Sequence, residues 1–153
     1  METTVADTST LIRLYKGNAF QYLRVLFDII YLPVAVQYEC HDKPIRESIS
    51  RPPFEIRAVT RLLDLGKIGI GEREAISLAI DLNIKSILTD DKRAINRANQ
   101  YKLRVLQSED ILLAIKSLDF IDSIKPIFDI MRATGEYIDE KTYWRILRQA
   151  GEA

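Results

Sequence analysis

Acidic residues are the side chains of this sequence best suited to chemistry. Only one histidine, His41, and one cysteine, Cys40, occur among the 153 residues. A histidine pair for acid–base cleavage of RNA is therefore impossible within one chain, as is a zinc site built from several cysteines or histidines. A single cysteine also excludes an internal disulfide and fits a reducing compartment. Any catalysis must depend on carboxylates.

Several carboxylates occupy positions that an α/β fold would bring together: Asp7, Glu39, Glu74, Asp90 and Asp91. Asp7 ends one expected strand, and Asp90 and Asp91 end another, while Glu39 and Glu74 follow expected helix starts. Strand ends and helix starts share one rim of a parallel sheet, where the sites of open α/β sheets form. Clustered carboxylates repel one another unless a hard cation binds among them, so the sequence predicts a site for Mg²⁺ or Mn²⁺. Such an ion lowers the pKa of a bound water and neutralises charge on a phosphodiester under attack.

Each acid also has a purely structural interpretation. Asp7 could cap the helix that follows it, and either Asp90 or Asp91 could do the same for the next helix along the chain. Glu74 could lie at the N3 position of its helix, where a carboxylate favours the helix dipole. Glu39 could simply face solvent. Their expected position on a common rim is what favours a metal site.

The elements that must position these acids follow an alternating pattern. Short apolar runs alternate with amphipathic segments of helix length, which is typical of βαβ units around a parallel sheet. Strands are expected up to Asp7, around Leu32, and over residues 84–89 and 103–107. Helices are expected over residues 10–17, 18–30, from Pro33, up to Leu65, and over 72–83 and 91–102. The segment 41–58 is rich in proline, serine and charge, so we expect an irregular connection or lid there.

The composition limits the number of domains, the charge and the cellular location that we expect. A chain of 153 residues with 47% apolar and 29% charged residues can form one compact domain, 1–153, with a helical part from about residue 108. Basic and acidic residues number 22 each, so a polyanion must meet a local basic patch or bound cations. No secretory signal and no apolar run of the ~20 residues that span a bilayer is present, so the expected location is the cytoplasm.

Four motifs carry a resemblance to the PIN-domain family that covers nearly the whole chain. They are VADTSTLI with Asp7, LPVAVQYE with Glu39, GEREAISLA with Glu72 and Glu74, and ILTDDKRAINRA with Asp90 and Asp91. The chain resembles VapC-type toxins of toxin–antitoxin pairs and, more closely, a poorly characterised PIN subgroup. The tail of that subgroup is also similar to residues 124–152.

The resemblance implies a three-layer α/β/α fold with a central parallel sheet of four or five strands, and a metal-dependent ribonuclease activity. The acids of the family match Asp7, Glu39, Glu74 and Asp91, with Asp90 as the alternative to Asp91. Supporting residues would be Ser9, Thr89 and Glu72. Similar proteins commonly form homodimers and are silenced by an antitoxin, so both partners are expected.

Basic residues follow the expected metal rim, at Lys92, Arg93 and Arg97. Such a patch could grip the RNA backbone, since phosphate contacts supply affinity without reading bases. The same residues could instead form an ordinary solvated helix face.

These observations predict a metal-dependent endoribonuclease that hydrolyses RNA phosphodiester bonds, as the toxin of a toxin–antitoxin pair. The alternative is a catalytically weak PIN-like module that binds RNA or a protein partner.

Overall fold

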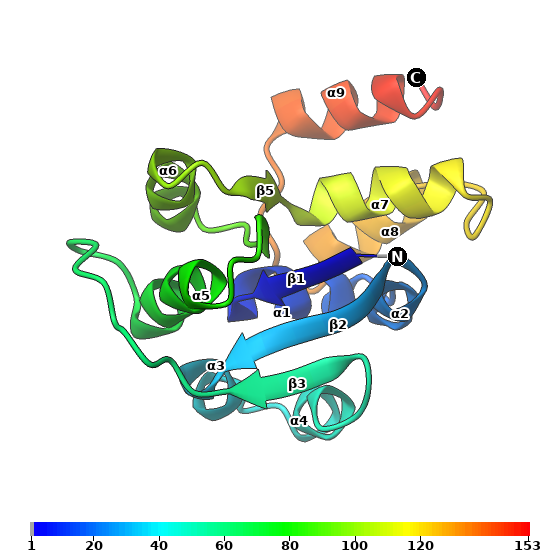
Figure 1. The fold of residues 1–153 in the computed structure, drawn as a ribbon. Coiled ribbons are helices and arrows are strands. Elements are labelled where there is room, and N and C mark those ends of the chain that lie inside the picture. Colours follow the sequence, from blue (N-terminus) through cyan, green and yellow to red (C-terminus); the bar gives the residue numbers. More distant parts are fainter. Residues whose placement is uncertain (1) are drawn as a thin grey trace.

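The computed structural model describes residues 2–153 and shows one sheet of five strands in the order β3-β2-β1-β4-β5 (Figure 1). The strands are β1 Glu2–Ala6, β2 Phe27–Pro33, β3 Phe54–Arg57, β4 Ser86–Leu88 and β5 Arg104–Leu106. Every neighbouring pair is parallel. The larger helices are α1 Thr8–Lys16, α5 Ile70–Asp81, α6 Lys92–Gln100, α7 Ser108–Ser117, α8 Lys125–Ala133 and α9 Glu140–Gln149. Shorter helical segments are η1 Phe20–Tyr22, α2 Leu23–Leu26, α3 Val34–Glu39 and α4 Lys43–Ile49.

Helices cover both faces of the sheet, which confirms the predicted fold class. Alternate strand residues point to opposite faces. Val5 and Ile87 accordingly pack with α5 and α6, whereas Ala6 and Leu88 pack with α1 and α7. These two apolar cores fix the sheet between its helical layers.

The segment 18–30, expected as one helix, is instead two short helical turns followed by β2. Its apolar residues recur at helical spacing, but Phe27–Pro33 is also rich in β-branched and aromatic residues, which suit a strand. Pairing with both β1 and β3 makes this stretch a strand.

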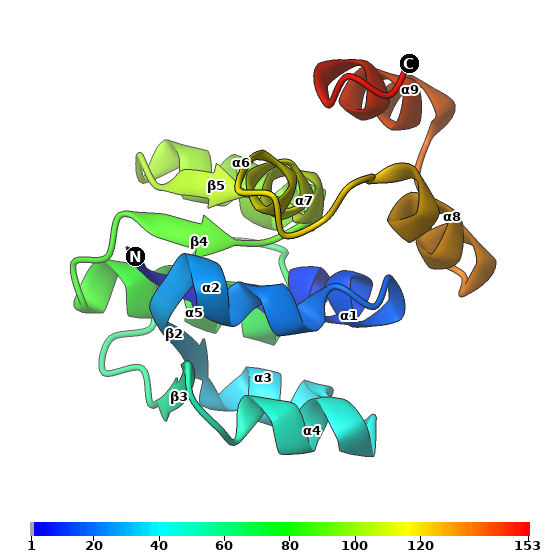
Figure 2. The same ribbon diagram turned by 90° about the vertical axis from the view of Figure 1, so that its right-hand side faces the viewer.

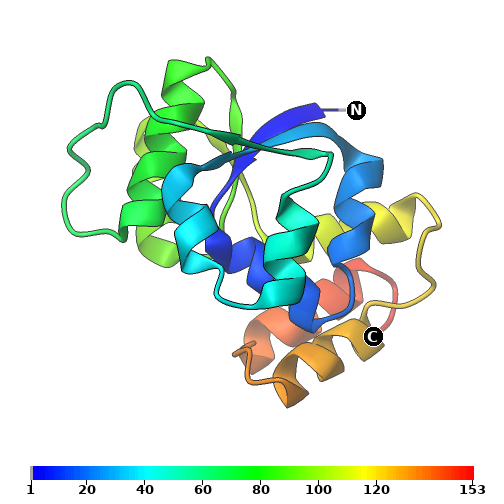
Figure 3. The ribbon, with the colours of Figure 1, turned by 90° about the horizontal axis from the view of Figure 1, so that it is seen from below.

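The segment 41–58 is also more regular than expected. It contains α4, whose N-cap Asp42 accepts a hydrogen bond from Ile45 N at 3.3 Å, and then β3. The helix expected up to Leu65 is absent, since β3 is followed by an irregular stretch, residues 58–69, that forms a wide loop beside α5 (Figure 3). We call this stretch the 58–69 segment.

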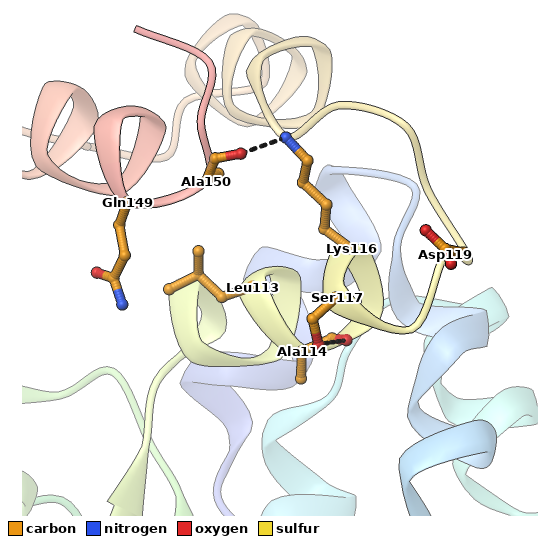
Figure 4. A pocket seen from close by; sticks show the side chains of 7 residues that line it. All are labelled: Leu113, Ala114, Lys116, Ser117, Asp119, Gln149 and Ala150. Atoms are coloured by element: carbon orange, nitrogen blue, oxygen red, sulfur yellow. Dashed lines mark hydrogen bonds between the residues drawn. The ribbon is translucent and has the colours of Figure 1, made fainter.

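The C-terminal part of the chain contains the helices α7, α8 and α9. Figure 2 shows α8 and α9 together at one side of the molecule, beyond α1 and α7. A Cβ at Gly17, where α1 ends, would lie 2.8 Å from Met131 Cε of α8, so glycine permits this close approach. A hollow of about 530 Å³ lies between α7 and the end of α9, where Lys116 Nζ donates to Ala150 O at 2.6 Å (Figure 4). Within residues 2–153, no helix combines the length and apolarity needed to cross a membrane.

Candidate active site

Asp7 lies at the carboxyl end of β1, in the centre of the sheet, and has no solvent exposure. Its Oδ1 accepts hydrogen bonds from Ser9 N at 3.0 Å and Ser9 Oγ at 2.7 Å, and its Oδ2 accepts one from Thr89 Oγ1. Asp7 is therefore the N-cap of α1, as the structural interpretation expected. The pKa of Asp7 is raised to about 7, chiefly by burial and also by the charge of Glu72, against the lowering effect of the bonds from Thr89 and Ser9.

Glu39 joins this rim from the end of α3. Its Oε2 accepts a hydrogen bond from Thr8 Oγ1 at 2.8 Å, and its Oε1 accepts one from Gly71 N at 3.1 Å. The carboxylate therefore connects the first turns of α1 and α5. A Cβ at Gly71 would lie 2.5 Å from Glu39 Oε2, so only glycine leaves room for this contact.

The start of α5 differs from the sequence prediction. The helix begins at Ile70 with Gly69 as its N-cap, so Glu72 rather than Glu74 occupies the N3 position. Residues two positions apart on a helix point about 200° apart around its axis, and the two glutamates face different neighbours. Glu74 Oε1 accepts a hydrogen bond from Ala35 N at 3.3 Å, in the first turn of α3.

The Glu72 carboxylate lies against the N-cap Gly69 and is influenced by the charges of the other acids. Burial raises the pKa of Glu72, and the charges of Asp91 and Glu39 raise it further, against a bond from its own N–H. Glu72 in turn raises the pKa of Asp7. These mutual effects place Glu72 within electrostatic reach of Asp7, Glu39 and Asp91.

The two adjacent aspartates after β4 take different roles. Asp91 is the N-cap of α6, where its Oδ1 accepts from Ala94 N at 2.9 Å. Asp90 points instead between α1 and α7, where it accepts hydrogen bonds from Thr10 Oγ1 at 2.9 Å and Ser108 Oγ at 3.1 Å. Arg13 Nε lies 3.8 Å from Asp90 Oδ2 as its ion-pair partner. Burial raises the pKa of Asp90, and Arg13 is the largest influence that lowers it.

The acids at the carboxyl edge of the sheet are Asp7, Glu39, Glu72 and Asp91. In the part of the chain that the structure describes, none of these four forms an ion pair with lysine or arginine. Across residues 2–153, no three acidic side chains are yet close enough together to hold a metal ion. Hydrogen bonds to hydroxyl and backbone groups occupy the oxygens of Asp7 and Glu39 in this conformation.

Their chemistry nevertheless fits a hard divalent cation. All donors are carboxylate or hydroxyl oxygens, which Mg²⁺ and Mn²⁺ prefer. The burial of Asp7 beside the negative charge of Glu72, with no cationic partner, is an arrangement that a bound cation would stabilise.

Sequence reasoning missed the direction of Glu72 and the contribution of Thr8. The signal for Glu72 lies in the sequence GIGE, where Gly69 can be the N-cap and place the glutamate three residues later. The run DTST places three hydroxyl groups directly after Asp7, at Thr8, Ser9 and Thr10. All three donate hydrogen bonds to carboxylates of different elements.

The structure is an all-parallel α/β/α domain with acidic residues at the carboxyl edge of its sheet. A family model described as a PIN domain matches residues 3–152, so the chain belongs to the PIN-domain family. Among solved structures, the chain is similar to the PIN domain endonuclease Utp24, with a TM-score of 0.55 and 12% identity over 69% of this chain and 84% of that one. At this identity the likeness shows a shared fold. No curated protein matches the sequence. Family membership confirms the predicted resemblance and supports a nuclease-type function.

Proposed function

We propose that the protein is a metal-dependent endoribonuclease whose cation ligands are Asp7, Glu39, Glu72 and Asp91. The proposal rests on the position of these four acids, which have no basic partner among the described residues, at strand ends, helix starts and the end of α3 along the carboxyl edge of a PIN-domain sheet. Mg²⁺ or Mn²⁺ bound there would supply an activated water and neutralise charge on the phosphodiester.

The surrounding residues of the chain orient these acids. Ser9 and Thr89 hold the two oxygens of Asp7, and Thr8 holds Glu39. Glu74, which the sequence favoured as the third ligand, we assign to positioning the first turn of α3. Asp90, the other sequence candidate, we assign to joining α1 and α7 through Thr10, Arg13 and Ser108.

RNA is the proposed substrate. Lys92 and Arg93 are exposed at the start of α6, directly after Asp91, and Arg97 lies one turn further along the helix. Cations at this place can hold backbone phosphates close to the acids, whose own charge would otherwise repel the strand.

The resemblance to VapC-type toxins extends the proposal to cellular role. The protein would act in the cytoplasm as the toxin of a toxin–antitoxin pair, as a homodimer that a cognate antitoxin silences. Expression in a bacterial host should then arrest growth, and co-expression of a small protein encoded beside it should restore growth. Growth at the normal rate with full expression would contradict the toxin role.

One observation favours the alternative, a catalytically weak module that binds RNA or a protein. Within residues 2–153, no three acids are grouped for a metal ion, and the oxygens of Asp7 are already hydrogen-bonded. Cation binding must therefore compete with these contacts, and a chain that keeps them would bind RNA without cutting it.

The two functions differ in the effect of Asp7→Asn. We expect this substitution to abolish Mg²⁺- or Mn²⁺-dependent cleavage of single-stranded RNA, because it removes a ligand charge but keeps the shape of the side chain. Asp122→Asn, at an exposed position away from the rim, serves as the control and should cleave like the wild type. Circular dichroism confirms that each variant is folded. Equal cleavage by wild type and Asp7→Asn would overturn the proposed site.

A further inference from the structure

The 58–69 segment and α6 enclose a hollow of about 280 Å³ beside the candidate active site. Its lining consists of Lys67 from the segment and of Arg93, Asn96 and Arg97 from α6. Each of these side chains can donate hydrogen bonds, and three of them carry a positive charge.

The charges in the hollow have no acidic partner. Among the described residues, Lys67, Arg93 and Arg97 form no ion pair. Like charges that face one space repel one another, and an anion bound among them relieves that repulsion. Arginine and lysine are also the side chains that commonly bind phosphate, arginine through paired hydrogen bonds.

The 58–69 segment is held against its neighbours although it contains no helix or strand. Asp81 accepts hydrogen bonds from Thr60 N at 3.0 Å and Thr60 Oγ1 at 2.8 Å, at the beginning of the segment. Further along, Arg73 Nε donates to Leu63 O at 2.6 Å, and Arg97 Nε donates to Leu65 O at 2.7 Å. The side chains of α5 and α6 therefore fix the backbone that carries Lys67.

Gly66 permits the last of these contacts. Its φ of +75° lies in the left-handed region that favours glycine, and a Cβ there would lie 3.3 Å from Arg97 Nη2. Leu65, directly before it, is buried against α5 and α6. Lys67 thus follows two residues that are already held in place. Binding a ligand there would cost less conformational entropy than ordering a free loop.

The helix that lines the hollow, α6, also carries a proposed metal ligand. Asp91 is the N-cap of α6, and Arg93 and Arg97 follow two and six residues later. At ~1.5 Å per residue, Arg93 and Arg97 lie about 3 Å and about 9 Å from Asp91 along the helix axis. These cations therefore lie on the first two turns of the helix that Asp91 caps.

We propose that this hollow binds a backbone phosphate of the RNA strand, next to the phosphate that is cleaved, with Lys67 as a contact residue. The proposal rests on the proposed function for the identity of the substrate. It adds a binding site to which the 58–69 segment contributes and gives that segment a role in holding substrate. Because the contacts are to phosphate, the site adds affinity without reading bases.

The test is the salt dependence of RNA binding, measured with a fluorescent single-stranded RNA oligonucleotide of mixed sequence. EDTA prevents cleavage, and salt is varied between about 50 and 200 mM, a range over which phosphate contacts change affinity strongly. We compare wild type with Lys67→Gln, Arg93→Gln and the double variant. Arg97 is left unchanged because it also holds the 58–69 segment through Leu65. Lys141→Gln, at an exposed position in α9, is the charge-matched control.

Each single variant should bind more weakly and should reduce the slope of log K against log salt by about 0.7, the value for one phosphate contact on a single strand. The double variant should lose about twice as much, and Lys141→Gln should match wild type. Slopes equal to that of wild type in Lys67→Gln and in the double variant would overturn the proposal, and so would a wild type that does not bind the oligonucleotide.

The same proteins separate this proposal from the proposed function. If wild type binds RNA with the predicted slopes but never cleaves it with Mg²⁺ or Mn²⁺, the phosphate site stands and the nuclease function fails. If wild type cleaves RNA and the slopes do not change, the nuclease function stands and the phosphate site fails.

Discussion

At the level of single residues, the hydroxyl groups that bind the acids are as important for the candidate site as the carboxylates themselves. Asp7 is held by Ser9 and Thr89, and Glu39 by Thr8, so the acids that approach one another do so with their oxygens already oriented. A buried carboxylate without such donors would carry a far larger desolvation penalty. The hydroxyl residues after Asp7 therefore support the proposed metal site.

The two glutamates of α5 should differ clearly in the effect of substitution by alanine. We expect Glu72→Ala to reduce RNA cleavage by at least roughly 10–100-fold, since even indirect changes at metal sites cost that much. Glu74→Ala removes only the bond to Ala35 N, so it should lower the free energy of unfolding by about 1 kcal/mol and keep most of the activity. Cleavage rates and urea unfolding of both variants measure the difference. The reverse pattern, with activity lost in Glu74→Ala alone, would restore Glu74 as the ligand.

The sequence predicted that Asp7, Glu39 and Asp91 lie on the rim, because strand ends and helix starts can be recognised from local patterns. It favoured Glu74 as the ligand, with Glu72 as a supporting residue, and it could not show that Gly69 rather than Gly71 becomes the N-cap of α5. Glycine is a favourable N-cap residue, so the residue type alone does not distinguish the two positions. The contact of Glu39 with Gly71 N, which only the folded chain shows, fixes the choice.

At the level of elements, strand pairing overrides helical spacing. Phe20, Leu23, Phe27 and Ile30 have helical spacing, yet Ile30 pairs with Thr4 of β1 and with Phe54 of β3. The pairing partners are distant in sequence, so no local pattern reveals them. The 58–69 segment is similar, since Asp81, Arg73 and Arg97 hold it from helices that come later in the chain.

The end of the chain is fixed to other elements by one carboxylate. Glu152 accepts hydrogen bonds from Ile124 N at 2.8 Å and Lys125 N at 3.0 Å at the start of α8, from Ser123 Oγ at 2.6 Å, and from Lys116 Nζ of α7 at 2.9 Å. Burial alone would raise the pKa of Glu152, but these bonds together lower it from 4.5 to about 2. A carboxylate whose folded pKa is lowered stabilises the fold above its unfolded pKa, and this stabilisation is lost as the pH falls.

Glu152→Gln should therefore lower the free energy of unfolding by about 2 kcal/mol near neutral pH, because it removes bonds to a charged group. The difference from wild type should shrink as the pH falls from 4.5 toward about 2, where the wild-type carboxylate also becomes neutral. Urea unfolding at a series of pH values measures it. A difference that stays constant from neutral pH to acid would show that the charge of Glu152 contributes nothing.

At the level of the whole molecule, opposite charges are separated although the chain is neutral overall. The acids of the candidate site lie on the rim, and the unpaired cations Lys67, Arg93 and Arg97 lie beside them on α6 and the 58–69 segment. Equal numbers of basic and acidic residues, 22 each, therefore do not exclude a polyanionic substrate. The alternation of apolar runs and amphipathic segments predicted the parallel sheet, and the resemblance to the PIN-domain family implied the three layers. The hollow required tertiary contacts that sequence patterns do not contain.

The proposed ribonuclease activity requires that divalent cations complete the site. The decisive measurement is the rate of cleavage of a single-stranded RNA by the wild-type protein after metal removal with EDTA, as Mn²⁺ is added back. We predict no cleavage in EDTA and a rate that rises with Mn²⁺ to saturation. Cleavage at the same rate in EDTA, or none at any Mn²⁺ concentration, would contradict it.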